Sequence, residues 1–312
     1  MKIGLYSISY QGQWYHGNPI PLKELIPKVA NYGFDGISIS GKRHHGSPLD
    51  LDDSTCQEIK ELADSCSLEL AVLDSYSNFM DPIIEHREAQ LVWFRELIRL
   101  ADKLEIDIVK VFSGWMGTTL RNGVAAYDML WRHLLPYATS YDRWNWIKDC
   151  ITECTGWAKD YGITLALQNH GPPFRPGYED ALEMIKEINA DNLKMCLDIG
   201  LGCMSDAQQT YEYLAEAVEA CRDLIIYSHY NGKFKETSSG VIQEGYDIPF
   251  SSKPGGSIMN YPAFIRELKK INYNGYIAYE VCGPVTINYQ HQGLAEVDRL
   301  VKAAYSYMRN LI

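Results

Sequence analysis

The sequence has little of what marks a nucleic-acid-binding, secreted or membrane-spanning protein. Its 29 Lys and Arg residues are outnumbered by 40 Asp and Glu, the formal net charge is −11, and the basic residues form no block. Because phosphate backbones and anionic membranes are bound through basic patches, we expect neither as a partner. No apolar run has the length of a membrane span, and the N-terminal segment MKIGLYSISY lacks the apolar core and cleavage site of a signal peptide. These absences predict a soluble cytoplasmic protein.

The eight cysteines do not have the spacing of a disulfide framework or a thiolate metal site. No Cys-x-x-Cys pair occurs, so they indicate buried or free thiols in a reducing compartment. Cys150 and Cys154 are spaced to share one face of a helix, an arrangement that fits metal binding but is more typical of core packing.

A glycine-rich phosphate-binding loop is also absent. The segment that would hold it, Ile3–Gln11, contains no Gly-x-Gly-x-x-Gly motif. This argues against an open, doubly wound sheet that binds a dinucleotide, which is the main competitor of a closed barrel for a chain built from βα units.

What the sequence does contain is a regular alternation of short apolar runs with segments of helical periodicity. Such alternation is typical of βα units around a parallel sheet. Eight strands are predicted, which fits a single (β/α)8 TIM barrel over residues 1–312, of α/β class. The predicted strands are Ile3–Ser9, Gly36–Ser40, Leu70–Asp74, Ile108–Phe112, Thr164–Asn169, Leu193–Asp198, Leu224–His229 and Tyr276–Val281.

Two long loops follow predicted strands. A barrel of this type takes roughly 250 residues, so about 60 remain to be placed. The surplus falls in Ser113–Tyr141, after the fourth strand, and in Tyr230–Tyr261, after the seventh, which includes Lys253–Gly256. Since barrel active sites are built at the carboxyl ends of the strands, we expect both loops to wall a substrate site.

Polar residues end the last four predicted strands. They are Gln168, Asp198, His229 and Glu280. A barrel directs side chains at these positions toward one centre. A carboxamide, two carboxylates and an imidazole suit Mn²⁺, or alternatively Mg²⁺ or Co²⁺, better than a thiolate zinc site. Each residue alone could be a helix cap, but the set predicts a divalent metal site.

These strand ends resemble those of the xylose isomerase-like barrels, the superfamily of sugar phosphate isomerases and epimerases that is also related to endonuclease IV. The resemblance covers essentially the whole chain and implies metal ligands Glu, Asp, His and Glu on strands five to eight. Gln168 departs from that pattern, and the frequent Asp-x-Gly-His appears as Asp198-Ile199-Gly200-Leu201. The endonuclease branch uses more metals and histidines, and an acidic chain opposes DNA, so we set it aside.

The glutamine bears on mechanism. The resemblance implies that epimerases of this group use the carboxylates of strands five and eight as paired acid and base. Because an amide cannot accept a proton, Gln168 favours a reaction with one base, beginning at the carbon next to a ketone. Glu280 is one catalytic candidate, and His170 and His45 are others, since histidine titrates near neutral pH. Alternatively these rings only hydrogen-bond sugar hydroxyls, and for His45 this alternative is favoured.

Four further residues are candidates for substrate binding. Arg43 would clamp a substrate oxygen, or else form a structural ion pair, and Asn169 directly follows Gln168. Trp115 and Tyr76 lie in loops at the predicted barrel mouth, where an aromatic face can stack on a sugar or an aryl group.

Three segments resemble a narrower group. Ser75–Phe79, Gln168–His170 and Tyr279–Pro284 resemble the larger (alpha) subunit of bacterial C-glycoside deglycosidases, which act on 3-oxo-glycosides with Mn²⁺ and a small beta-type partner subunit. The resemblance implies removal of the C2 proton and loss of the aglycone from C1 by β-elimination.

Three hypotheses follow. The first is a metal-dependent lyase, the catalytic subunit of a C-glycoside deglycosidase, in an oligomer that includes a partner subunit. The second is an isomerase or 3-epimerase that acts on a free ketose or sugar phosphate and needs a second base. The third is a barrel subunit that binds a glycoside without turnover.

Overall fold

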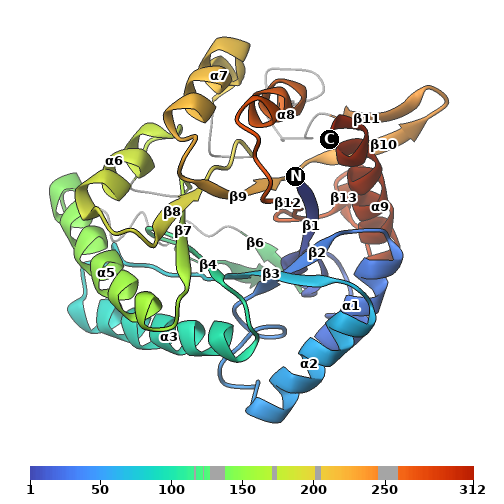
Figure 1. Ribbon diagram of the computed structural model, residues 1–312. Helices are drawn as coiled ribbons and strands as arrows, with labels where there is room; N and C mark the ends of the chain where they lie inside the picture. The colour runs from blue at the N-terminus through green and yellow to red at the C-terminus, as the bar shows by residue number, and fades with distance from the viewer. Residues whose placement is uncertain (116, 122, 127–137, 171–173, 201–204, 245–258) are drawn as a thin grey trace.

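The computed structural model describes residues 1–115, 117–121, 123–126, 138–170, 174–200, 205–244 and 259–312. Eight parallel strands close into a barrel in the ring order β1-β12-β9-β8-β7-β4-β3-β2, and Figure 1 shows them at the centre of the molecule. The predicted TIM barrel is therefore confirmed. The strands are β1 Lys2–Tyr6, β2 Gly36–Ser40, β3 Glu69–Asp74, β4 Ile108–Val111, β7 Thr164–Gln168, β8 Leu193–Cys196, β9 Ile225–Tyr230 and β12 Tyr276–Tyr279.

Helices form an outer ring around these strands (Figure 1). Each buries an apolar stripe against the barrel, as α1 does with Leu22, Leu25, Ile26 and Val29. Cys150 and Cys154 are buried free thiols in α5, which confirms the prediction of core packing. The helices are α1 Leu22–Asn31, α2 Asp53–Ser65, α3 Ile84–Lys103, α5 Ser140–Asp160, α6 Glu179–Ile188, α7 Tyr211–Ala220, α8 Tyr261–Lys270 and α9 Leu294–Leu311.

The first strand is shorter than predicted. β1 ends at Tyr6, and the short 3-10 helix η1 (Ser7–Tyr10) takes up the rest of the apolar run. The hydroxyl of Ser7 accepts a hydrogen bond from the backbone N–H of Ser40 (2.8 Å), and that of Ser9 accepts one from Val281 (2.9 Å). The serines therefore satisfy backbone donors at the ends of neighbouring strands, a role that the alternating sequence pattern does not reveal.

Both long loops contain a short hairpin. The loop after β4 forms β5 (Thr119–Arg121) and β6 (Val124–Ala126), and the loop after β9 forms β10 (Lys233–Thr237) and β11 (Gly240–Glu244). Figure 1 shows the β10–β11 hairpin projecting from the molecule, so this part of the loop does not wall a barrel-mouth site. The residues Lys253–Gly256 and Leu201 lie outside the described part of the chain.

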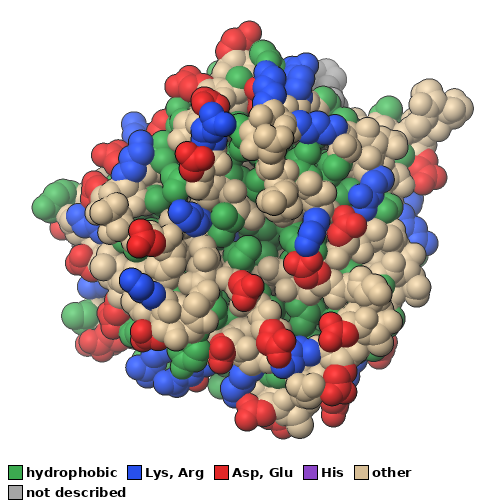
Figure 2. Space-filling view, viewed as in Figure 1, with side chains coloured by type: hydrophobic (Ala, Val, Ile, Leu, Met, Phe, Trp, Pro, Cys, Tyr) green, Lys and Arg blue, Asp and Glu red, His purple; other side chains and the backbone are tan. Residues whose placement is uncertain are grey.

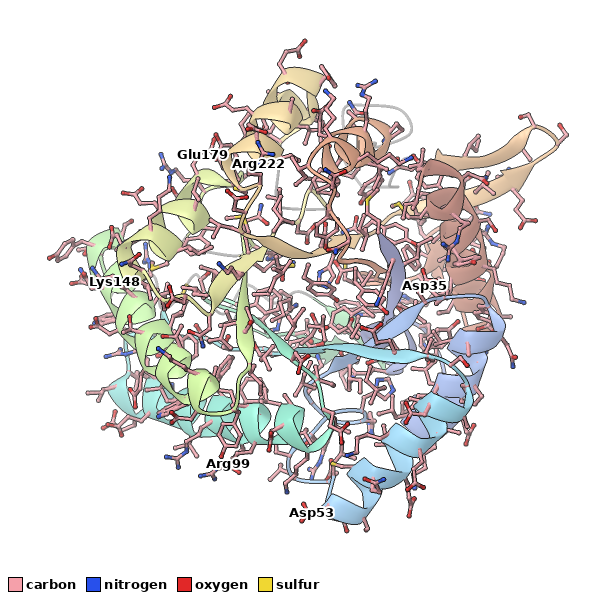
Figure 3. The ribbon with its side chains drawn as sticks, viewed as in Figure 1. Asp35, Asp53, Arg99, Lys148, Glu179 and Arg222 are labelled. Carbon is pink, nitrogen blue, oxygen red and sulfur yellow. The ribbon has the colours of Figure 1, made fainter. Side chains whose placement is uncertain are left out.

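The outer surface mixes charges of both signs. Acidic and basic side chains are interspersed on the face in Figure 2. Asp53 and Arg99, labelled in Figure 3 on the outer helices, pair with Lys103 and Glu96. Among the described helices, none combines the length and the apolar character that a membrane span requires.

Candidate metal centre and active site

The polar strand ends meet at one end of the barrel. Gln168 is the last residue of β7, Asp198 follows β8, His229 lies within β9 and Glu280 follows β12. These four strands are consecutive in the ring, so their carboxyl ends lie side by side. All four side chains are buried or nearly so.

Three of these residues form a cluster of the size that one ion requires. Ligand atoms of Asp198, His229 and Glu280 all lie within 4.8 Å of one another. His229 Nδ1 is 3.9 Å from Asp198 Oδ2 and 3.9 Å from Glu280 Oε2. Ligand distances of about 2.0–2.6 Å separate any two ligands of one divalent ion by no more than about 5 Å. The cluster therefore fits a divalent cation.

Gln168 completes the cluster. Its Nε2 donates to Asp198 Oδ2 (2.7 Å) and lies 3.3 Å from His229 Nδ1, while its Oε1 is buried without a hydrogen-bond partner among the described residues. Rotating the terminal amide by 180° exchanges the two atoms. The oxygen would then face Asp198 and His229 at spacings normal for neighbouring ligands of one ion. The buried, unpartnered oxygen fits a fourth ligand.

Side chains on the Nε2 side of His229, away from the cluster, fix its imidazole ring. Its Nε2 lies 2.9 Å from the Tyr227 hydroxyl and 3.5 Å from Asp74 Oδ1, and its ring stacks on Tyr6 with centroids 5.3 Å apart. A metal-binding histidine usually donates its second ring N–H to such an oxygen, which fixes the ring and its tautomer. This arrangement leaves Nδ1 as the nitrogen for a metal.

Asp74 also pairs with a lysine inside the barrel. Lys110 Nζ lies 3.2 Å from Asp74 Oδ1, and the two side chains are 1% and 0% exposed. The pair lies on the Nε2 side of His229, and the Asp74 carboxylate supplies the negative charge that this nitrogen faces. Sequence reasoning missed both residues as site residues, although a lysine inside the apolar run Ile108–Phe112 was a usable signal.

Backbone contacts fix the Asp198 carboxylate. Its Oδ1 accepts from the backbone N–H of Gly200 (2.6 Å), so Oδ2 is left to face the cluster. Asn169 accepts from the Asp198 N–H (2.7 Å) and donates to the backbone oxygens of Asp198 (3.0 Å) and Gly177 (2.9 Å). Asn169, predicted to bind substrate, is therefore occupied in holding the Asp198 strand end.

Comparison with known proteins identifies the family of this chain. The model of the xylose isomerase-like TIM barrel family matches residues 26–310. The chain belongs to this family. A D-psicose 3-epimerase structure is similar with a TM-score of 0.71, at 17% identity over 100% of this chain and 99% of that one. A 3-keto-D-glucoside 4-epimerase from E. coli is similar with a TM-score of 0.67, at 18% identity over 99% of both chains.

A relative found by sequence has a higher identity than these two structures. An uncharacterized protein of Methanocaldococcus jannaschii is 26% identical over 289 residues, which cover 90% of this chain and 83% of that protein. The two epimerase structures share the fold of this xylose isomerase-like barrel.

The environment of Glu280 in this xylose isomerase-like barrel changes the pKa of its carboxylate. Burial raises the pKa of Glu280, the His229 ring opposes the rise, and the Asp198 carboxylate adds to it. The side chain keeps about 10% exposure, and its Oε1 accepts a long hydrogen bond from Asn231 Nδ2 (3.5 Å). Glu280 thus combines a position in the cluster with access to the barrel mouth.

Two of the predicted residues lie outside the cluster. His45 is buried, its Nδ1 lies 2.9 Å from Ser7 Oγ, and its Nε2 lies 3.0 Å from the Ile20 carbonyl. Burial lowers the pKa of His45 to about 4, and the neutral ring is fixed between two protein partners, so neither ring nitrogen is presented to a sugar hydroxyl. Arg43 is exposed and pairs with both oxygens of Asp50 through its Nε (2.8 and 3.1 Å).

The other predicted residues come together as an aromatic wall. Trp115 lies 6.4 Å from Tyr76, 5.3 Å from Phe112 and 6.1 Å from His170, measured between ring centroids. Burial lowers the pKa of His170 to about 4. Its ring is therefore neutral at pH 7 and a weak base. Tyr76, Trp115 and His170 remain partly exposed, which places them on a surface that a substrate can reach.

Proposed function

We propose that this protein is a divalent-metal-dependent enzyme that transfers protons at a carbon next to the ketone of a sugar, in the manner of sugar isomerases and epimerases. One observation carries the proposal: the buried cluster of Gln168, Asp198, His229 and Glu280 at the carboxyl end of the barrel. Membership in the xylose isomerase-like family supports it. So does the likeness in fold to ketose 3-epimerases and a keto-glucoside epimerase.

The cluster would hold the ion through one amide oxygen, two carboxylates and one imidazole. Mn²⁺ is the ion we propose first, with Mg²⁺ and Co²⁺ as alternatives, because the donors are mostly oxygen with a single nitrogen. When bound, such an ion polarises a sugar carbonyl and makes the neighbouring C–H more acidic.

We assign removal of the substrate proton to the carboxylate of Glu280. Asp198 is engaged by Gly200 and Gln168, whereas Glu280 accepts a long hydrogen bond from Asn231, has Cys282 as a hydrogen-bonding neighbour and keeps some exposure. A carboxylate whose pKa is raised by burial binds a proton more readily than an ordinary one. The aromatic wall would stack on the C–H face of the sugar and exclude water.

Gln168 gives a second candidate function specific support. With an amide in place of the usual carboxylate, the cluster contains two carboxylates, and Asp198 is held by Gly200 and Gln168, so Glu280 is the one assigned to accept a proton. An elimination needs one base, so cleavage of a 3-oxo-glycoside, with the aglycone leaving from C1 after loss of the C2 proton, is the second candidate. In that form the protein would be the catalytic subunit of a C-glycoside deglycosidase with a small partner subunit.

One set of reactions separates these candidates. The purified protein is stripped of metal, reloaded with Mn²⁺, and given a ketohexose, a 3-keto-glucoside or a 3-oxo C-glycoside. We expect an epimer or isomer to form by chromatography only with metal present. Release of the aglycone without epimer formation would replace the first candidate with the second. Absence of any metal-dependent product from all three substrates would contradict both, and would leave the non-catalytic glycoside-binding subunit.

A further inference from the structure

A lysine at the mouth of the barrel takes no part in the metal cluster. Lys42 follows β2, and its Nζ lies 3.8 Å from the centre of the Tyr76 ring. No ion pair joins Lys42 to any residue that the structure describes. Burial, with a smaller contribution from the positive charge of Lys110, lowers the pKa of Lys42 to about 7. An amine of this kind gives and takes a proton near neutral pH.

The backbone holds Lys42 in place. Its N–H donates to the Ser40 carbonyl (2.8 Å), and its own carbonyl accepts from the N–H of His45 (2.9 Å). The preceding Gly41 is packed so tightly that a Cβ there would lie 2.9 Å from the backbone oxygen of Asp74. The segment is therefore fixed to the barrel, and the lysine side chain starts from a defined point.

The amine lies in the sector of the barrel that faces Glu280. The Lys42 amine lies over the ring of Tyr76, which follows β3, and the positive charge of Lys110 on β4 lowers the pKa of Lys42. In the ring order, β2 lies two strands from β12, after which Glu280 lies, and β3, which precedes the Tyr76 ring beneath the amine, lies three strands from β12, one short of opposite. The Tyr76 hydroxyl contacts the Tyr6 hydroxyl (2.6 Å), and the Tyr6 ring stacks on the metal-ligand candidate His229. A sugar seated between the cluster and the aromatic wall would therefore have Glu280 on one side and Lys42 on the other.

We propose that Lys42 is the second proton-transfer group of this enzyme, acting on the face of the sugar opposite Glu280. The proposal rests on the proposed proton-transfer function. The Glu280 carboxylate takes the proton from the carbon next to the ketone, and the C–H electron pair forms the double bond of an ene-diol(ate). The Lys42 ammonium then gives a proton to the same carbon from the other face, and the carbonyl re-forms. Lys42 is left as an amine and Glu280 as an acid, and both return to their starting states by proton exchange with water.

This assignment supplies what Gln168 cannot. An amide accepts no proton, so a two-face reaction needs a titratable group elsewhere. Among the residues that the structure describes, the ionisable groups related to Lys42 by contact or charge are Tyr76 after β3, Lys110 from β4 and His45 on its own segment. None of them is a carboxylate that would hold the lysine permanently charged.

The test separates the two half-reactions. The Mn²⁺-loaded wild type, Lys42→Met and the control Lys235→Met, an exposed lysine of β10, are incubated with a ketohexose in D₂O. Deuterium uptake into unreacted ketose and formation of the epimer are both measured. We expect Lys42→Met to keep deuterium uptake within about threefold while epimer formation falls by ~100-fold or more, the size typical of a lost acid or base. Wild-type epimer formation in Lys42→Met, or parallel loss of uptake and epimer at unchanged metal affinity, would overturn the proposal.

A second measurement needs no variant. Competitive labelling of the metal-loaded wild type with cyanate, read by peptide mass spectrometry across a pH series, should give Lys42 a midpoint near pH 7. A midpoint near the value of about 10.4 for a free lysine would overturn the proposal. If the wild type takes up no deuterium from any ketose, the proposed function itself fails; if it epimerises and Lys42→Met does so equally well, only the role of Lys42 fails.

Discussion

The two halves of the barrel mouth differ in charge and in task. The half formed by β7, β8, β9 and β12 carries the carboxylates of Asp198 and Glu280 with one amide and one imidazole. The half formed by β1 to β4 carries Lys42 and Lys110 with the carboxylate of Asp74. The first half suits a cation, and the second suits the negative charge that develops on a substrate oxygen.

The contrast shows how one barrel separates metal binding from support. The His229 ring joins the halves, because its Nδ1 faces the cluster while its Nε2 faces Asp74. Removing a charged group from the half that carries Asp198 and Glu280, the acidic half, should therefore abolish turnover. Removing one from the half that carries Lys42, Lys110 and Asp74, the basic half, should weaken metal binding, reprotonation or stability.

Removing the base of the acidic half should have the largest effect. In Glu280→Gln we expect kcat to fall by ~10³-fold, within the range for loss of a general base, because the amide accepts no proton. The exposed Glu236→Gln in β10 is the matched control and should retain wild-type turnover. Comparable turnover of the two variants on a ketose would remove Glu280 from the chemistry.

Removing the carboxylate of the basic half should act through the metal. In Asp74→Leu we expect metal affinity, measured by calorimetry, to weaken by ~10–100-fold because His229 loses its outer partner. Stability should fall by about 3–5 kcal/mol in chemical denaturation, since Lys110 is left buried without its partner. The double variant Asp74→Leu/Lys110→Met should recover stability but not affinity. If affinity is unchanged in both, Asp74 does not position His229.

The buried, neutral histidines should make the folded protein sensitive to acid. Burial lowers the pKa of His45 to about 4, below the unfolded value of about 6.5, so the unfolded chain binds more protons between these limits. Stability should therefore fall as the pH drops from 6.5 to 4, with His170 acting in the same direction. His45→Gln should reduce this loss by about 3 kcal/mol. The exposed His291→Gln should reproduce the wild-type pH curve, and an equally steep curve for His45→Gln would refute the assignment.

Adding charge to the acidic half should tighten the metal site modestly. In Gln168→Glu we expect Mn²⁺ affinity to rise by ~10-fold, because affinity for hard cations increases with ligand charge. The ratio of epimer formation to aglycone release should rise as well. Titration with Mn²⁺ and product analysis on a 3-oxo-glycoside check both, and a variant with weaker binding would argue against Gln168 as a ligand.

The smallest effect should come from Arg43, on the outside of the basic half. Its exposed pairing with Asp50 predicts that Arg43→Ala keeps KM and metal affinity within about twofold of the wild type, since surface ion pairs contribute little. A tenfold rise in KM would instead support the substrate clamp considered for this residue.

The sequence predicted the barrel well because its signals are local. Gly36–Ser40 is a strand as predicted, with all of its residues buried, and the stripe of α1 is buried as predicted. The end of β1 was wrong, because Ser7 and Ser9 hydrogen-bond across the ring, and such partners depend on closure of the barrel. The residues of the acidic half were also predictable from the sequence, since each of them ends an apolar run.

The basic half was not predictable in the same way. Lys42 and Lys110 come from segments far apart in the sequence, and only the folded ring brings them near Tyr76 and Asp74. His45 and Arg43 lie beside Lys42 in the same basic segment. The local sequence does not show that the His45 ring is buried, that the Arg43 guanidinium is exposed and that the Lys42 amine lies at the barrel mouth.

A single cation shared by Gln168, Asp198, His229 and Glu280 is the central requirement of the proposed chemistry. Crystals grown with Mn²⁺ and measured at a wavelength where manganese scatters anomalously would locate it directly. We predict one strong anomalous peak at about 2.0–2.4 Å from oxygen or nitrogen atoms of Asp198, His229 and Glu280, with the Gln168 amide as a fourth neighbour. A manganese peak elsewhere, with none between these residues, would contradict the central claim.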